Sequence, residues 1–184
     1  MCLHESYEIF SWFKIYFIEN IGMAFGMELG SKLFLSMFRV VFIGLIVAYI
    51  VQQVKAKARI GYIVCLSMVL AGAIGNMLDS MFYGLIFNAS NPFYPATSVP
   101  FGTGYAGFLM GKVVDMFYFP LIVTTWPEWI PLVGGDEFVF FSPVFNFADA
   151  SISAGVVWLL LFYRKEISRI SFKRPNIFSH SCEN

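Results

Sequence analysis

The sequence predicts an α-helical integral membrane protein, organised as a transmembrane helix bundle in a single domain. Only 13% of the 184 residues are charged and 58% are hydrophobic, whereas soluble domains usually carry about 25% charged residues. The mean hydropathy is +0.71. Apolar runs recur at lengths that suit a hydrocarbon core about 30 Å thick, and basic residues follow directly after two of them.

The first 32 residues are expected to lie outside the membrane. They contain acidic residues and no basic region ahead of an apolar stretch, so they do not resemble a signal peptide. Ile9 to Glu19 is rich in aromatic and β-branched residues, which predicts a strand. Gly22 and Gly26 then interrupt the pattern, and their spacing alone favours a turn.

Three segments are predicted to cross the membrane, namely 33–54, 60–80 and 146–163. Arg39 lies near one end of the first segment and is expected to extend its side chain to the interface. Small residues from Ala71 to Gly75 end the second segment and would let helices approach closely in lipid. Asn76 and Asp79 follow there on one helix face.

Residues 81–145 are aromatic and rich in Gly and Pro, which predicts an external segment that lies against the membrane surface. The part from Asn88 to Gly107 contains three prolines and cannot cross a membrane as a helix. The run from Val113 to Thr125 is too short to span and contains Asp115 and Pro120. Phe138 to Phe141 is expected to form a short strand.

Basic residues predict the orientation of these segments. The loop at 55–59 and the tail at 164–184 hold eight of the 12 Lys and Arg residues, which favours a cytoplasmic location for both. The polar residues of the apolar segments then collect near the outer surface. The N-terminus would also be external with no preceding span to export it, so we expect the chain to lack an earlier transmembrane helix.

Several classes of site are not expected. Cys2, Cys65 and Cys182 show no CxxC spacing, and the two histidines form no HExxH pattern, which argues against a metal site or a disulfide framework. No basic face is interleaved with stacking aromatic residues, so nucleic acid is not an expected partner.

Asp115 and Asp149 are the candidate catalytic residues. Two carboxyls within hydrogen-bond reach do not both ionise easily, so one keeps a proton. The charged carboxylate can take a proton from a water that attacks a peptide carbonyl, while the protonated one polarises that carbonyl and protonates the leaving amine. Which aspartate holds the proton stays open at this point.

Simpler roles also remain open for these residues. Asp149 suits a helix cap or a partner of the helix dipole, and Asn76 and Asn146 suit helix-packing or capping amides. A non-enzymatic membrane protein, such as a transporter subunit that uses the carboxylates for proton coupling, is the alternative function. It predicts acidic side chains near the bilayer midplane.

Four sequence blocks follow one another along the chain. They are Asn20-Ile21-Gly22-Met23-Ala24-Phe25-Gly26, Gly72-Ala73-Ile74-Gly75-Asn76-Met77-Leu78-Asp79, Val113-Val114-Asp115 and Phe145-Asn146-Phe147-Ala148-Asp149. Taken together and in this order, they resemble those of the lipoprotein signal peptidase (signal peptidase II) family of bacterial aspartyl endopeptidases. The resemblance implies a transmembrane helix bundle with a small extracytoplasmic β-cradle, to which residues 1–32 contribute, and an interfacial helix. It implies a multi-pass enzyme of the bacterial cytoplasmic (inner) membrane whose peptidase domain covers 1–163.

The resemblance also implies the chemistry. Diacylglyceryl-modified prolipoproteins would be cleaved before the lipid-modified cysteine of the lipobox, after entering laterally from the membrane lipid. A cyclic-peptide inhibitor of the family, globomycin, would occupy the same site, and no metal or organic cofactor is implied. Asp115 and Asp149 correspond to the catalytic pair, and the substrate-binding residues would be Asn20, Gly22, Asn76, Asp79 and Asn146.

This sequence departs from the family pattern at three points. The family usually has four transmembrane helices and the first is expected to be absent here, which leaves an inactive truncated homologue as a further alternative. Ser80 stands where many members have Arg, which removes a cation expected near the site. The stretch between Asp79 and Asp115 is longer than in compact members, and it would form a flap or lip over the site.

Overall fold

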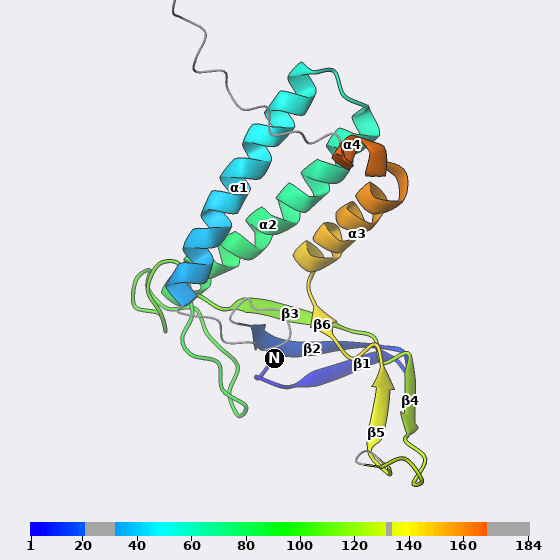
Figure 1. Ribbon diagram of the computed structural model, residues 1–184. Helices are drawn as coiled ribbons and strands as arrows, with labels where there is room; N and C mark the ends of the chain where they lie inside the picture. Colours follow the sequence, from blue (N-terminus) through cyan, green and yellow to red (C-terminus); the bar gives the residue numbers. More distant parts are fainter. Residues whose placement is uncertain (21–31, 132–133, 169–184) are drawn as a thin grey trace, which may run out of the picture.

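The computed structural model describes residues 1–20, 32–131 and 134–168. Apolar helices stand on one side of a small antiparallel sheet, and a separate hairpin projects from the far end of that sheet (Figure 1). Gly22 lies outside the described residues, as does most of the predicted tail. The layered arrangement places the sheet against the ends of the helices.

Three long helices follow the apolar runs of the sequence. Helix α1 covers Lys32–Lys55, α2 covers Ile60–Ile86 and α3 covers Phe147–Phe162, and a short α4 at Arg164–Ser168 follows α3. Among the described residues, α1 and α2 are long and apolar enough to cross a membrane, whereas α3 has 16 residues. Helix α2 therefore continues six residues past the predicted segment 60–80.

Large apolar side chains cover the outer faces of these helices. Phe34 and Leu45 on α1 are 67% and 63% exposed, and Leu161 on α3 is 66% exposed. Such surfaces are unfavourable in water but are ordinary where lipid is the solvent. The buried core between the helices is correspondingly small and centres on Tyr62, Cys65 and Leu159.

The sheet combines strands from the N-terminal part of the chain with strands from residues 113–145. It contains β1 (Ser6–Phe10), β2 (Phe13–Asn20), β3 (Val113–Tyr118) and β6 (Val144–Phe145), in the order β1-β2-β3-β6 with antiparallel neighbours. The single strand predicted for 9–19 is thus wrong: the chain turns at Ser11 and Trp12 and forms a hairpin. This turn contains Ser11, a weak turn signal, but no Gly, Asn, Asp or Pro, which mark turns more strongly.

Strands and loops make up the described part of 87–145. Strands β4 (Ile122–Thr125) and β5 (Glu137–Phe140) pair to form the projecting hairpin, and β5 lies one residue before the predicted strand. No helix occurs in the described residues between α2 and α3, so the interfacial helix expected within 81–145 is not found there. The loop before β3 is held to α1, because the buried Ser36 hydroxyl donates to the Leu109 carbonyl at 2.7 Å.

Close contact between α2 and the start of α3 depends on Gly72. A Cβ atom at this position would lie 2.3 Å from the Ala148 carbonyl oxygen and 2.7 Å from Ile152 Cγ1. Even the smallest side chain would therefore push the two helices apart. The small residues predicted to allow close helix packing serve that purpose here.

Gly72→Ala is expected to destabilise the protein by about 1–3 kcal/mol, because the added methyl group meets backbone atoms that cannot move independently. Gly44→Ala is the matched control, since a Cβ atom there has no neighbour within 4 Å. It should stabilise α1 by about 0.5–1 kcal/mol. Thermal unfolding in detergent micelles measures both, and unfolding of Gly72→Ala at the wild-type temperature would contradict the packing.

Candidate active site

Helix α3 begins with a capping box formed by two of the predicted site residues. The Asn146 side-chain oxygen accepts from the Asp149 backbone N–H at 3.0 Å, and Asp149 Oδ2 accepts from the Asn146 backbone N–H at 3.3 Å. The capping role considered for Asp149 is therefore present. The cap uses one carboxylate oxygen of Asp149 and leaves the other oxygen for a different partner.

The amide group of Asn146 connects the two predicted catalytic residues. Its Nδ2 donates to Asp115 Oδ1 at 2.8 Å and to the Asn76 side-chain oxygen at 3.0 Å. Asn76 Nδ2 in turn donates to Asp149 Oδ1 at 2.7 Å. Asn20 Nδ2 donates to Asp115 Oδ2 at 3.1 Å. All four carboxylate oxygens thus accept a hydrogen bond from an asparagine side chain or from the helix cap.

Four separate elements supply these side chains. Asn20 ends β2, Asn76 lies on α2, Asp115 lies on β3, and the capping box starts α3. The antiparallel pairing of β2 with β3 places Asn20 opposite Val113, so that its side chain reaches Asp115 on the same sheet face. Residues from positions 20 to 149 therefore converge where the sheet meets the helices.

Burial gives the two carboxyls different properties. Asp115 is only 3% exposed, and this burial raises its pKa to about 6, an effect that the hydrogen bond from Asn20 opposes and the neighbouring Asp149 charge reinforces. Asp149 is half-buried. Because a buried carboxyl resists ionisation, Asp115 keeps its proton up to a higher pH than an ordinary aspartate does.

Asp79 lies beside this network and is not one of its hydrogen-bonded members. Its carboxylate interacts with the Tyr83 hydroxyl and the Val114 backbone, and it lies close enough to Asp149 for their charges to repel. The neighbouring Ser80 is fully buried in α2. A side chain at position 80 therefore faces the protein interior and contributes no charge to the site.

Arg39 is a site residue that the sequence analysis missed. It is half-buried on α1 and lies close enough to Asp149 for their opposite charges to attract. Whether it also reaches the membrane interface, as expected from the sequence, stays a prediction. A signal was present in the sequence, because Lys32, Ser36 and Arg39 recur at the spacing of one helix face and give this apolar helix a polar inner stripe.

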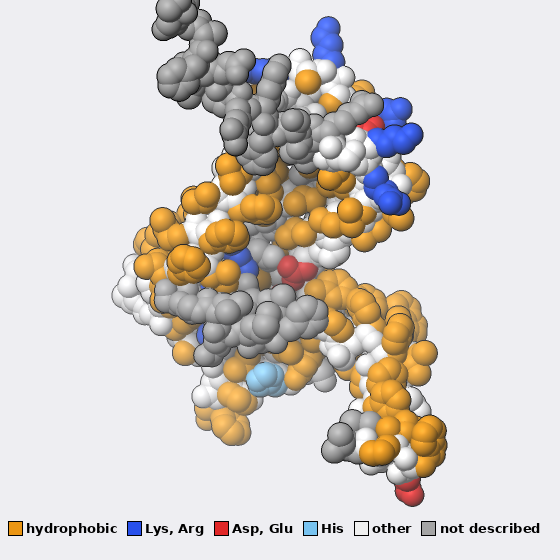
Figure 2. Space-filling view, in the orientation of Figure 1, with side chains coloured by type: hydrophobic (Ala, Val, Ile, Leu, Met, Phe, Trp, Pro, Cys, Tyr) orange, Lys and Arg blue, Asp and Glu red, His pale blue; other side chains and the backbone are white. Residues whose placement is uncertain are grey.

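An aromatic surface continues from Asp115 along β3. Phe117 stands on the same face two residues further on, and its ring lies 4.5 Å from Phe147 and 6.1 Å from Phe145 between centroids. Figure 2 shows this side of the molecule hollowed between helices and sheet, with acidic side chains at the hollow. Asp149, the less buried of the two carboxyls, therefore lies beside an apolar surface, while Asp115 lies beneath it.

Among the residues that the structure describes, no group of three or more His, Cys, Asp and Glu side chains is placed to hold a metal ion. The arrangement provides one buried carboxyl with a raised pKa, one half-buried carboxyl and several amide donors. These groups can position a water molecule and a peptide carbonyl by hydrogen bonding alone.

One carboxyl on the sheet and one at the start of an apolar helix, linked through the Asn146 amide, suit a membrane-bound aspartic-type endopeptidase. The family comparison identifies which one. A family model described as signal peptidase (SPase) II matches residues 1–164, and the chain belongs to that family of bacterial membrane enzymes.

Two similar proteins named lipoprotein signal peptidase align with most of the chain. A lipoprotein signal peptidase from Porphyromonas gingivalis is 50% identical over 169 residues, covering 91% of this chain and 74% of its own length. The lipoprotein signal peptidase from Amoebophilus asiaticus is 34% identical over 163 residues, covering 86% of this chain and 64% of its own.

The fold is also found in solved structures. One of them, a bacterial membrane enzyme determined by the in meso method at 2.3 Å resolution, superposes with a TM-score of 0.56 at 22% identity. The similarity covers 94% of this chain and 79% of the other. At this identity the comparison establishes the shared arrangement of helices and sheet only.

Substitutions of Asn146 separate its capping role from its role between the carboxyls. Asn146→Ala loses both roles. The protein should lose about 1 kcal/mol of stability with the cap and about 1–3 kcal/mol with the acceptors left without a donor. Asn146→Ser keeps a good cap but still loses the amide donor. Both variants should lose endopeptidase activity, while Ser should unfold at a higher temperature than Ala. Wild-type activity in Asn146→Ser would show that capping is the only role.

Proposed function

We propose that this protein removes the signal peptide from diacylglyceryl-modified prolipoproteins, and that Asp115 and Asp149 are its catalytic pair. Relatives named lipoprotein signal peptidase, at up to 50% identity, support the substrate class. The observation that carries the residue assignment is the Asn146 amide, which donates to Asp115 and accepts from the Asp149 backbone. Cleavage would occur before the lipid-modified cysteine.

The unequal burial of the two carboxyls supports a different role for each. Asp149, half-exposed and near Arg39, removes a proton from a water molecule as the water oxygen attacks the scissile carbonyl carbon. Asp115, whose pKa is raised by burial, donates a hydrogen bond to the carbonyl oxygen and then protonates the leaving amine. The C–N bond breaks, and the pair is left with its single proton on Asp149.

Substrate binding would use the polar and aromatic parts of the hollow separately. Asn20, Asn76, Asp79 and Asn146 lie where they can orient a peptide backbone, and Gly22 belongs to the same proposed set. Phe117, Phe145 and Phe147 offer an apolar surface to the residues or acyl chains beside the scissile bond. An inhibitor that mimics the peptide, such as globomycin, would compete for this place, and surrounding membrane lipid would deliver the substrate laterally.

The proposed topology is a multi-pass protein of the bacterial inner membrane, with α1, α2 and α3 as spans, the sheet outside and the C-terminus in the cytoplasm. Basic side chains gather at the ends of the helices farthest from the sheet (Figure 2), which supports this orientation. The 16 residues of α3 reach about 24 Å. Its first turn, with Asp149, would therefore lie at the outer boundary of the hydrocarbon, where a lipid-anchored substrate is held.

Asp115→Asn and Asp149→Asn test the assignment. Each removes one ionisable group of the pair while keeping side-chain size, so cleavage of a diacylglyceryl-prolipoprotein should fall at least about 1,000-fold. The reconstituted enzyme is assayed by the gel shift of the processed product. Asp136→Asn, in the loop between β4 and β5, is the control and should cleave normally. Normal cleavage by either site variant in a folded protein would refute the catalytic pair.

Arg39→Gln tests the proposed support of Asp149 by a cation. Loss of the charge should lower kcat by about 10–100-fold, because the carboxylate of Asp149 loses an attractive neighbour. Arg39→Lys should restore kcat in part. The control Lys57→Gln removes a charge just beyond the opposite end of α1 and should leave kcat unchanged. An unchanged kcat in a folded Arg39→Gln variant would contradict a role for Arg39 at the site.

A further inference from the structure

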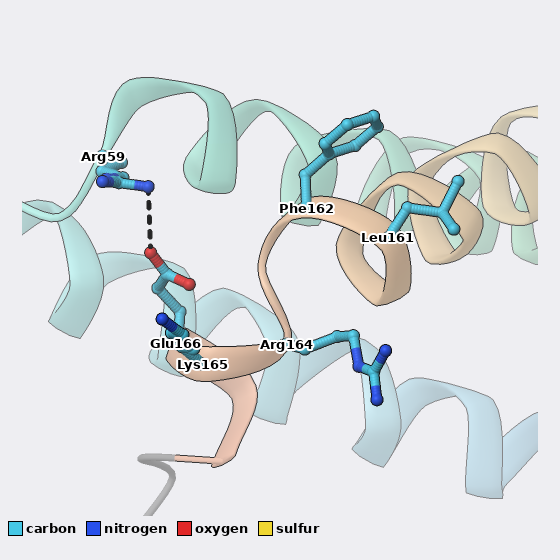
Figure 3. Close-up of a pocket in the computed structure, with 6 residues that line it drawn as sticks. All are labelled: Arg59, Leu161, Phe162, Arg164, Lys165 and Glu166. Atoms are coloured by element: carbon cyan, nitrogen blue, oxygen red, sulfur yellow. Dashed lines mark ion pairs between the residues drawn. The ribbon is translucent and has the colours of Figure 1, made fainter.

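A second hollow lies at the opposite end of the helices from the carboxyls. It has a volume of about 740 Å³ and is bounded by the start of α2 and by the junction of α3 with α4. Figure 3 shows its lining side chains, which come from both segments. They are Arg59, Leu161, Phe162, Arg164, Lys165 and Glu166.

The charged side chains of this hollow are mainly cationic. Arg59 Nη1 lies 3.5 Å from Glu166 Oε1, and Figure 3 shows the two side chains facing each other. In the described parts of the chain, neither Arg164 nor Lys165 takes part in an ion pair, and both are exposed. Three cations and one anion give the hollow a net charge of about +2, counting the ordinary charge states.

An apolar groove continues from this cationic hollow between α2 and α3. A neighbouring cavity of about 580 Å³ shares Arg59 and Phe162 with it and is lined further by Val64, Met68 and Trp158. The rings of Trp158 and Phe162 stack at 4.7 Å between centroids and form one wall. The two cavities together therefore present charged groups at the helix ends and an apolar channel along the helices.

We propose that this composite cavity binds an anionic glycerophospholipid. Arg59, Arg164 and Lys165 would hold the phosphate and the acidic headgroup, because guanidinium groups pair well with phosphate and each basic side chain near a membrane surface attracts anionic lipid. One acyl chain would lie in the groove against Val64 and Trp158. Glu166 competes with the phosphate for Arg59 and sets a limit on the affinity. This site is separate from the proposed peptidase site.

The test measures lipid retained by the full chain, using native mass spectrometry after mixing with phosphatidylglycerol or phosphatidylcholine of matched acyl chains. The wild-type protein should retain phosphatidylglycerol preferentially. Arg164→Gln/Lys165→Gln should reduce that preference by about tenfold or more. Lys55→Gln/Lys57→Gln removes the same charge at the same end of the molecule but outside the cavity, and it should change the preference less than twofold.

Two further variants separate the parts of the cavity. Glu166→Gln should strengthen phosphatidylglycerol retention, because Arg59 loses its competing carboxylate, whereas Val64→Trp should fill the groove and weaken retention of both lipids. Met68→Trp replaces Val64→Trp if the latter fails to fold.

Equal retention of the two lipids by the wild-type protein would overturn the proposal, as would equal effects of the two double variants. Displacement of the lipid by millimolar glycerol phosphate would show a simple anion site and would also overturn it. Prolipoprotein cleavage is assayed separately in the same samples, so failure of the lipid site is distinguishable from failure of the proposed peptidase function.

Discussion

The side-chain amide of Asn146 is the interaction on which the rest of the site depends. Its oxygen caps α3, while its nitrogen donates to Asp115 on the sheet and to Asn76 on α2. An aspartate in its place would add a third negative charge and a serine would supply only a single donor. Because the capping box fixes the Asn146 side chain, the two aspartates are held by backbone structure and do not rely on a mobile loop.

This arrangement explains how an apolar protein keeps two carboxyls together. Burial disfavours the charged form of Asp115 and raises its pKa to about 6, while hydrogen bonds from Asn20 and Asn146 limit the cost of any charge that remains. Asp149 stays accessible and lies near Arg39. These unequal surroundings support the proposal that the two carboxyls share one proton. Two equally exposed surface carboxylates would give no such support.

Much of this was predictable from the sequence, because apolar run length and basic flanks report directly on membrane helices. The convergence of Asn76, Asp115, Asn146 and Asp149 also followed from those runs. Strand pairing was less predictable. Glu19 pairs with Val114 across the sheet, and its carboxylate binds Lys112 at 2.7 Å, a lysine that resembles an ordinary interface residue in the sequence. Register between strands so far apart in the chain leaves no local pattern. The contribution of Arg39 left a local signal only in the polar stripe that it forms with Lys32 and Ser36 on one helix face.

The ionisation of Asp115 in the folded protein tests the account most directly. Infrared difference spectra between acidic and neutral pH report the protonated carboxyl, and the same spectra of Asp115→Asn assign the band to this residue. We expect Asp115 to titrate near pH 6, about two units above an ordinary aspartate, and so to hold its proton at pH 5. A carboxyl at position 115 that is fully ionised at pH 5 would contradict the shared-proton pair.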